Sequence, residues 1–274
     1  MSHKKDIQVI QIPCILNVLK INGVTMINAY HRPNTISEAL DLLKKPGILP
    51  LGGGALLSTI KSAATIEVVD LQALGLNTIC KNGNNLEIGA STALQELLES
   101  EHAPEALKAA LKLEAPLNIR NAATVAGTLV AADGRSTFAT VMLALDAKLS
   151  LQPNDEEIEI GNFLPVRKDQ LPGKLITAIA MPLNARLALE TVARTPADKP
   201  ILCAALAIWP SGRTRLALGG YGKAPLLAMD GTEAEGLEAA ARNAFHEATD
   251  EWGSAAYRMD VAATLAKRCV EKLA

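Results

Sequence analysis

The C-terminal third of the chain carries the pattern that most constrains its fold. Four apolar segments with strand character lie at residues 175–180, 187–192, 202–209 and 214–218, and two helical segments follow at about 233–247 and 254–272. Strands that follow one another along a chain form a sheet, and helices grouped after them cover one of its faces. We therefore predict an α+β fold rather than a strictly alternating α/β fold.

The preceding residues mix short strands and helices. Strands are predicted at 48–51 and 65–71, hairpins at 77–90 and 148–160, and helices near 36–45, 93–100, 104–113 and 138–145. Residues 118–130 are rich in small side chains and are predicted as loop and extended chain. A Pro/Gly-containing stretch at 165–173 is predicted to be a domain boundary. The predicted organisation is an N-terminal extension (1–23), a domain of two subdomains (24–170) and a C-terminal domain (171–274).

Composition excludes several classes of protein. Apolar residues make up 49% and charged residues 20% of the 274 residues, which indicates a globular chain. The formal net charge of -2 gives no basic surplus for nucleic acid, and no apolar run is long enough to span a membrane. The four cysteines are dispersed, which argues against a metal or iron–sulfur cluster within the chain. We read no signal peptide, and expect a cytoplasmic location.

Two segments could approach a ligand through the backbone. Gly52-Gly53-Gly54 follows a predicted strand, and consecutive glycines let N–H groups point at one anion. Residues 120–129, RNAATVAGTL, combine small side chains around Gly127. Neither segment is a GxGxxG or a Walker sequence. Each alone is compatible with a simple turn or a close-packed loop, so both alternatives remain open at this point.

The ordered set of motifs resembles one family. The motifs are YHRPNTISEAL (30–40), GGGALL (52–57), LEIGAST (86–92), RNAATVAGTL (120–129) and LALDA (143–147). Together they resemble the FAD-binding subunits of molybdenum hydroxylases, such as the medium subunit of carbon monoxide dehydrogenase and the flavin domain of xanthine dehydrogenase. Weaker similarity continues to about residue 272, and the order of the motifs is far more specific than any one of them.

The resemblance implies a fold, a cofactor and partners. The fold would be the vanillyl-alcohol-oxidase type, with two α+β subdomains around a non-covalent FAD and a smaller α+β C-terminal domain. The partners would be an iron–sulfur subunit and a molybdopterin subunit, and the chain would relay electrons to an external acceptor. The residues implied to bind FAD are Leu51, Gly52, Gly53, Gly54, Ala55, Leu56, Thr124, Val125, Ala126, Gly127, Thr128, Asp133 and Thr137.

Several positions depart from the family pattern. Gly54 and Ala55 stand where the family usually has polar residues, and Thr137 stands where it usually has Asp. These changes predict weakened FAD binding, and Thr137→Asp is predicted to strengthen it. Replacing Gly53 or Gly127 by Val is predicted to abolish FAD binding without unfolding the chain. A flavin-free scaffold protein and a self-contained flavin oxidase are the alternative functions.

Four further side chains have two interpretations each. His31 could approach the flavin or lie exposed in a loop, and Arg120 could bind phosphate or form a structural contact. Asp133 could bind a ribityl or ribose hydroxyl or cap a loop, and Tyr221 could cover the flavin ring or pack at a strand end. Charged residues of the last helix, including Arg258, are expected to face solvent.

Overall fold

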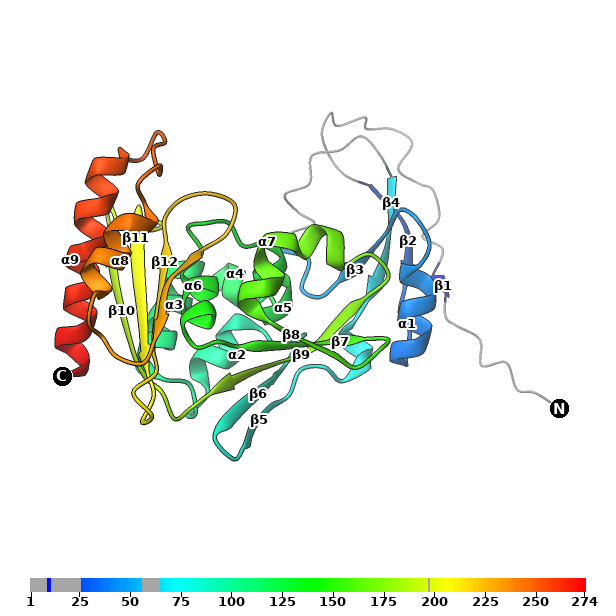
Figure 1. The fold of residues 1–274 in the computed structure, drawn as a ribbon. Helices are drawn as coiled ribbons and strands as arrows, with labels where there is room; N and C mark the ends of the chain where they lie inside the picture. Colours follow the sequence, from blue (N-terminus) through cyan, green and yellow to red (C-terminus); the bar gives the residue numbers. More distant parts are fainter. Residues whose placement is uncertain (1–8, 11–25, 56–64, 197) are drawn as a thin grey trace.

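The fold consists of three sheets and the helices packed between and outside them (Figure 1). It is known from a computed structural model that describes residues 9–10, 26–55, 65–196 and 198–274. The predicted end of the first glycine loop, Leu56, and the expected N-terminal extension, apart from residues 9–10, lie outside the described residues. No helix in the described ranges is both long and apolar enough to cross a membrane.

The first sheet holds the first glycine loop. Its strand order is β1 (Val9–Ile10), β2 (Met26–His31), β4 (Thr65–Asp70) and β3 (Ile48–Leu51), with β2 and β3 both parallel to β4. Helix α1 (Ile36–Leu43) begins where predicted, because the Thr35 side chain accepts a hydrogen bond from the Glu38 N–H. The loop leaves the C-terminal end of β3.

The second sheet is antiparallel and has five strands. Their order is β5 (Ile79–Asn82), β6 (Asn85–Gly89), β9 (Leu175–Pro182), β7 (Lys148–Gln152) and β8 (Glu156–Glu159). Both predicted hairpins are confirmed. In the first, Asn82 pairs with Asn85, and Gly83, the first of the two loop residues, adopts a left-handed φ of 59°.

Strand β9 affects the predicted division of the chain. Most of residues 165–173 form the end of helix α7 (Ile160–Gln170) rather than a linker. The strand that follows, β9, pairs with β6 and β7 and so occupies the centre of the second sheet. The domain limits stay a prediction, and this pairing favours a division after Pro182 over one after Gln170.

Three helices besides α7 share a core with the second sheet: α2 (Leu94–Glu99), α3 (Glu105–Glu114) and α6 (Thr137–Ala144). A 3-10 turn at Gln72–Leu74 follows β4. The loop prediction for 118–130 is wrong, because this stretch contains α4 (Leu117–Arg120) and α5 (Val125–Ala131). Thr124 starts α5 by accepting a hydrogen bond from the Gly127 N–H.

The third sheet is covered on both faces. It is an antiparallel meander of β10 (Arg186–Val192), β11 (Leu202–Ile208), β12 (Thr214–Gly219) and β13 (Leu226–Gly231). Alternate residues of β11 enter two different cores: Ala205 faces the core shared with α3 and α6, and Leu206 faces α8 (Leu237–Ala244) and α9 (Ala255–Leu273). Figure 1 shows this sheet between the two pairs of helices.

Arg258 on α9 does not face solvent, and that expectation is wrong. Its side chain is fully buried. Its guanidinium donates to the carbonyls of Ala248 and Gly253 at 2.7 and 2.6 Å and to the Asp250 carboxylate at 2.6 Å. It therefore fixes the loop before α9. Burial alone would raise the pKa of Asp250, but the hydrogen bond from Arg258 and two backbone N–H groups lower it below its usual value.

A second ionic cluster joins the third sheet to the loop after α6, and it makes stability depend on pH. Arg213 and Arg215 both contact Asp146 and Asp230. The hydrogen bond from Arg213 is the main reason that the pKa of Asp230 lies below its usual value, and burial opposes it. Because the folded-state pKa is depressed, the stabilisation is present above the unfolded value of about 3.9 and is lost as pH falls through the folded one.

We therefore expect the free energy of unfolding to fall below about pH 4 more steeply in the wild type than in Asp230→Asn. Urea denaturation between pH 7 and pH 2.5 measures this. Asp41→Asn, which alters an exposed ion pair on α1, is the control and should follow the wild-type curve. If the free energy of unfolding falls with pH equally in the wild type and Asp230→Asn, the ion pairs of Asp230 are not the cause of the pH dependence.

Candidate functional site: a cavity between two glycine loops

The two glycine-containing segments meet at one wall of a cavity of about 780 Å³. Backbone contact is so close that a Cβ added to Gly53 would lie 1.4 Å from the Ala122 carbonyl oxygen. A Cβ added to Gly52 would lie 2.9 Å from the Thr124 hydroxyl. Residue 53 therefore accepts glycine only, because it meets backbone, whereas a side chain at residue 52 would have to displace the Thr124 side chain. The volume is in the range of small-molecule and cofactor sites.

The first loop offers free backbone donors. Among the described residues, the N–H groups of Gly52, Gly53 and Gly54 have no hydrogen-bond partner. Gly54 has a φ of +76°, which a residue with a side chain rarely adopts. All three residues line the cavity. Consecutive unpaired N–H groups form the kind of concave surface that binds an anion.

The second loop differs, because its N–H groups already have partners. Ala126 donates to the Ala90 carbonyl at 3.2 Å, Gly127 to the Thr124 hydroxyl at 3.2 Å, and Thr128 to the Thr124 carbonyl at 2.9 Å. The two segments, which the sequence suggests could both approach a ligand through the backbone, therefore differ in the donors they offer. The second loop supplies shape, together with the hydroxyls of Thr124 and Thr128.

A buried carboxylate supports the first loop. Asp70 ends β4, directly beside Leu51 in the parallel register. Its carboxylate accepts a hydrogen bond from the Tyr30 hydroxyl, and Arg32 lies 3.6 Å away. The hydrogen bond to Asp70 raises the pKa of Tyr30 above its usual value, with burial adding to the effect. Through Tyr30 and Arg32, the YHRP motif therefore holds the end of β4, which pairs with β3 directly before the loop.

The cavity also contains polar groups that no motif indicated. The Ser91 hydroxyl is buried, has no hydrogen-bond partner and belongs to a lining residue. Lys168, Lys174 and Lys199 also line the cavity. Lys174 is 2.5 Å from Glu156 and Lys199 is 3.7 Å from Asp133, whereas Lys168 has no ion pair within the described ranges. Ser91 lies in the LEIGAST motif, which could have drawn attention to it, but isolated lysines carry no sequence signal.

Most of the predicted site residues line the cavity. They are Leu51, Gly52, Gly53, Gly54, Ala55, Thr124, Ala126, Gly127 and Thr128. Three others do not. Val125 is fully buried in the core, Asp133 is exposed beside Lys199, and Thr137 is buried with its hydroxyl on the Ala110 carbonyl at 2.8 Å. Thr137 therefore faces α3 rather than the cavity.

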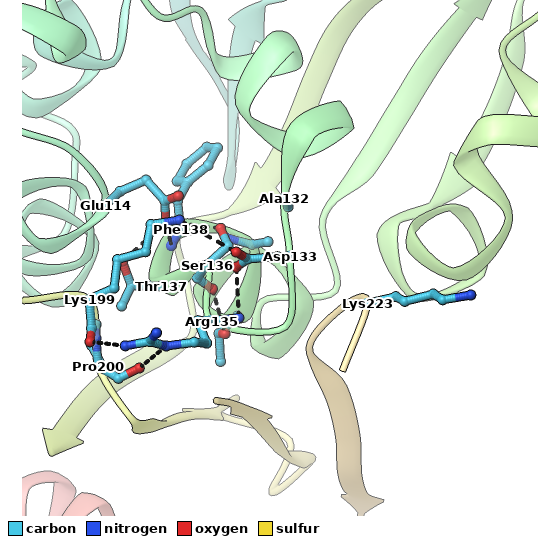
Figure 2. A network of polar contacts seen from close by, with 12 residues as sticks. Glu114, Ala132, Asp133, Arg135, Ser136, Thr137, Phe138, Lys199, Pro200 and Lys223 are labelled. Atoms are coloured by element: carbon cyan, nitrogen blue, oxygen red, sulfur yellow. Dashed lines mark hydrogen bonds and ion pairs between the residues drawn. The ribbon is translucent and has the colours of Figure 1, made fainter. Parts of the chain in front are cut away.

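A polar network connects the cavity to the third sheet (Figure 2). Arg135 donates to the carbonyl oxygens of Lys199 and Pro200, directly before β11. Its guanidinium also stacks on Trp252, 4.2 Å from the ring centroid. Buried Arg167 donates to the Lys223 carbonyl at 3.0 Å, in the loop before β13. Lys199 is thus held at the edge of the cavity by Arg135 at its carbonyl and by Asp133 at its ammonium group.

The four ambiguous side chains have structural contacts. Arg120 donates to Gln95 at 2.9 Å and to the Ala115 carbonyl at 2.7 Å. His31 lies on β2, 3.0 Å from Glu67. Tyr221 packs against the core of the third sheet with Arg258 over its ring, 5.4 Å from the centroid. Asp133 accepts a hydrogen bond from the Arg135 N–H at 2.9 Å, which is a loop-capping contact.

The fold and cavity define a protein with a small-molecule site whose backbone N–H groups and lysines suit an anionic ligand. Comparison with known proteins identifies the family. The model described as "FAD binding domain in molybdopterin dehydrogenase" matches residues 22–184. The uncharacterized protein YgfM of Escherichia coli K12 is 30% identical over 247 residues, 88% of this chain and 94% of that protein. The carbon monoxide dehydrogenase medium chain of Afipia carboxidovorans is 28% identical, covering 89% of this chain and 95% of its own.

Solved structures agree with this match. Carbon monoxide dehydrogenase from Hydrogenophaga pseudoflava superposes with a TM-score of 0.77 at 25% identity, covering 91% of this chain and 97% of that one. Carbon monoxide dehydrogenase from Oligotropha carboxidovorans superposes with a TM-score of 0.76 at 27% identity, covering 92% of this chain and 98% of that one. The chain therefore belongs to the family of FAD-binding domains of molybdopterin dehydrogenases, which are oxidoreductases. The predicted family, fold class and cofactor are confirmed.

The described residues fit FAD. The orphaned Ser91 hydroxyl, the unpaired N–H groups of the first loop and the lysines are donors, which a pyrophosphate requires. Within the described ranges, no group of three or more His, Cys, Asp or Glu side chains is arranged to hold a metal ion.

Proposed function

We propose that this chain is the flavin-binding, electron-relaying subunit of a molybdenum hydroxylase complex. The observation that carries the proposal is the cavity between the two loops, with its free N–H groups on Gly52, Gly53 and Gly54. These groups and the lysines would bind the pyrophosphate, and Ser91 would donate to a further oxygen. When bound, FAD supplies the ability to accept electrons singly and to release them in pairs.

The partners would be an iron–sulfur subunit and a molybdopterin subunit. Support comes from relatives whose names identify them as medium chains of carbon monoxide dehydrogenase and of glyceraldehyde dehydrogenase. Within this chain, the loops would fix the cofactor, and Lys199, in the loop before β11, would contribute to the cavity wall. Co-purification of all three subunits from natively expressed cells tests the assembly, and isolation of this chain alone under mild conditions would count against it.

FAD should bind more tightly than FMN, by at least about tenfold, because a pyrophosphate can use both the glycine loop and the lysines. Calorimetric titration of the purified chain with each flavin measures the two Kd values. Riboflavin, which has no phosphate, serves as the control and should bind most weakly. Equal affinities for FAD and FMN would contradict a pyrophosphate site.

One observation favours a second candidate, a flavin-free scaffold. The N–H groups of Ala126, Gly127 and Thr128 are satisfied internally, so the second loop adds few new contacts to a ligand. The visible spectrum of the purified protein separates the two functions. A flavin spectrum that survives dialysis supports the relay. A protein that stays colourless after incubation with excess FAD, yet still assembles with the other subunits, supports the scaffold.

A further inference from the structure

The charged side chains that line the cavity are three lysines and a single acid among the described residues. The acid is Glu114, the last residue of α3. A phosphorylated ligand explains the lysines but not the carboxylate, since an ionised carboxylate accepts hydrogen bonds only and repels phosphate. A carboxylate oxygen at the cavity can accept a hydrogen bond from a hydroxyl or N–H group of the ligand.

The contacts of Glu114 leave one oxygen available. Its Oε2 atom accepts hydrogen bonds from the Phe138 N–H at 3.0 Å and the Ser136 hydroxyl at 2.9 Å, and the Thr137 hydroxyl lies 3.2 Å away. Figure 2 shows the carboxylate beside the start of α6. Its Oε1 atom has no partner among the described residues. The contacts therefore anchor one oxygen and orient the side chain while the other stays free to accept.

We propose that Glu114 binds the ligand by accepting a hydrogen bond at Oε1 from a sugar hydroxyl of the flavin nucleotide. This inference rests on the proposed function. Hydroxyl groups of the ribityl chain and of the adenosine ribose are the donors that such a nucleotide offers. Glu114 would thereby supply, from α3, the carboxylate that the family pattern usually has at the position of Thr137, whose hydroxyl it approaches.

The test must separate ligand binding from the capping of α6 by Glu114. Glu114→Ala removes both the acceptor and the cap, whereas Glu114→Ala combined with Thr137→Asp returns a carboxylate at residue 137, whose side-chain oxygen lies 3.2 Å from the Glu114 Oε2 atom. Glu105→Ala, at the exposed start of the same helix, is the matched control. Thr137→Asp alone would put two carboxylates next to each other in a buried site, so it should lower the melting temperature rather than strengthen FAD binding.

Calorimetric titration with FAD should show a Kd raised on the order of tenfold or more in Glu114→Ala, and unchanged in Glu105→Ala. The double variant should recover most of the lost affinity. Titrations with FMN and with ADP locate the hydroxyl. If Glu114→Ala raises the Kd for FMN relative to the wild type, the hydroxyl belongs to the ribityl chain. If it raises the Kd for ADP, the hydroxyl belongs to the adenosine ribose. Melting temperatures measured without ligand report the loss of the cap separately.

Two results would overturn this inference while leaving FAD binding intact. One is an unchanged Kd for FAD in Glu114→Ala. The other is a weakened Kd that Thr137→Asp does not recover, accompanied by a lowered melting temperature, which would assign Glu114 to helix capping. Failure of the wild-type chain to bind any flavin would reject the proposed function and this inference together.

Discussion

Gly53→Val is expected to abolish FAD binding and to destabilise the chain. An added Cβ would lie 1.4 Å from the Ala122 carbonyl oxygen and 2.5 Å from its carbon, so the two loops would have to separate. Backbone atoms cannot move aside as easily as the end of a flexible side chain can. Separation would move the N–H groups that face the cavity. The sequence alone predicts that Gly53→Val abolishes FAD binding and leaves the fold intact. The structure supports the loss of binding but predicts that the fold is destabilised as well.

Calorimetric titration with FAD and a thermal melt measure the two effects. Gly161→Ala is the control, because the Cβ there would meet only the Leu143 Cδ1 atom, at 3.3 Å. Gly127→Val should have a smaller effect than Gly53→Val, since its Cβ would meet the Thr124 hydroxyl at 2.9 Å, a side chain able to rotate. Wild-type affinity for FAD in Gly53→Val would show that the loops do not pack as described.

Arg258→Ala is expected to lower the free energy of unfolding by about 3–5 kcal/mol, the usual result of breaking a buried ion pair. For a chain of this size that corresponds to roughly 10 °C or more in Tm. The substitution would leave the carbonyls of Ala248 and Gly253 without their donor and Asp250 without its counterion. Loss of the Arg258 side chain would also leave a cavity behind Tyr221.

Differential scanning calorimetry of the ligand-free chain measures the change. Arg268→Ala supplies the matched control, since Arg268 is exposed on the same helix and should shift the unfolding free energy by no more than about 0.5 kcal/mol. The effect of Arg258→Ala should also shrink at a pH low enough to protonate Asp250. Equal Tm values for the two variants would mean that the Arg258 contacts do not contribute to folding.

Elements with a local chemical signature were predictable from sequence. The Thr35 cap of α1, the Asn-Gly turn between β5 and β6 and the four strands from 175 to 218 are confirmed by the structure. The stretch 118–130 was not, because Asn, Thr and Gly, which disfavour a helix, interrupt its alanines. Its helices are fixed instead by Thr124 as a cap and by packing against the cavity wall. Strand β13 was also missed, since its four apolar residues are consecutive rather than alternating with polar ones, and none of them is fully buried.

The residues of the site also fall into a group that was predictable from sequence and a group that was not. The glycine loops were predictable because close backbone approach demands glycine, and the geometry at Gly53 explains the demand. Ser91, Glu114 and the lysines could not be identified as a group, because they come from distant segments and share no spacing. Thr137 was placed at the site by its position in the motif alone, but its side chain turns toward α3 and its hydroxyl donates to the Ala110 carbonyl.

The central position of β9 in the second sheet has a consequence for biosynthesis. The hairpins β5–β6 and β7–β8 are complete once residue 159 has left the ribosome, yet they do not pair with each other. Isolated hairpins are marginally stable, and their open edges invite pairing with other chains. Only when the nascent chain reaches residue 182 can β9 join the two halves. A ribosome that stalls between these points would expose a chain prone to aggregation.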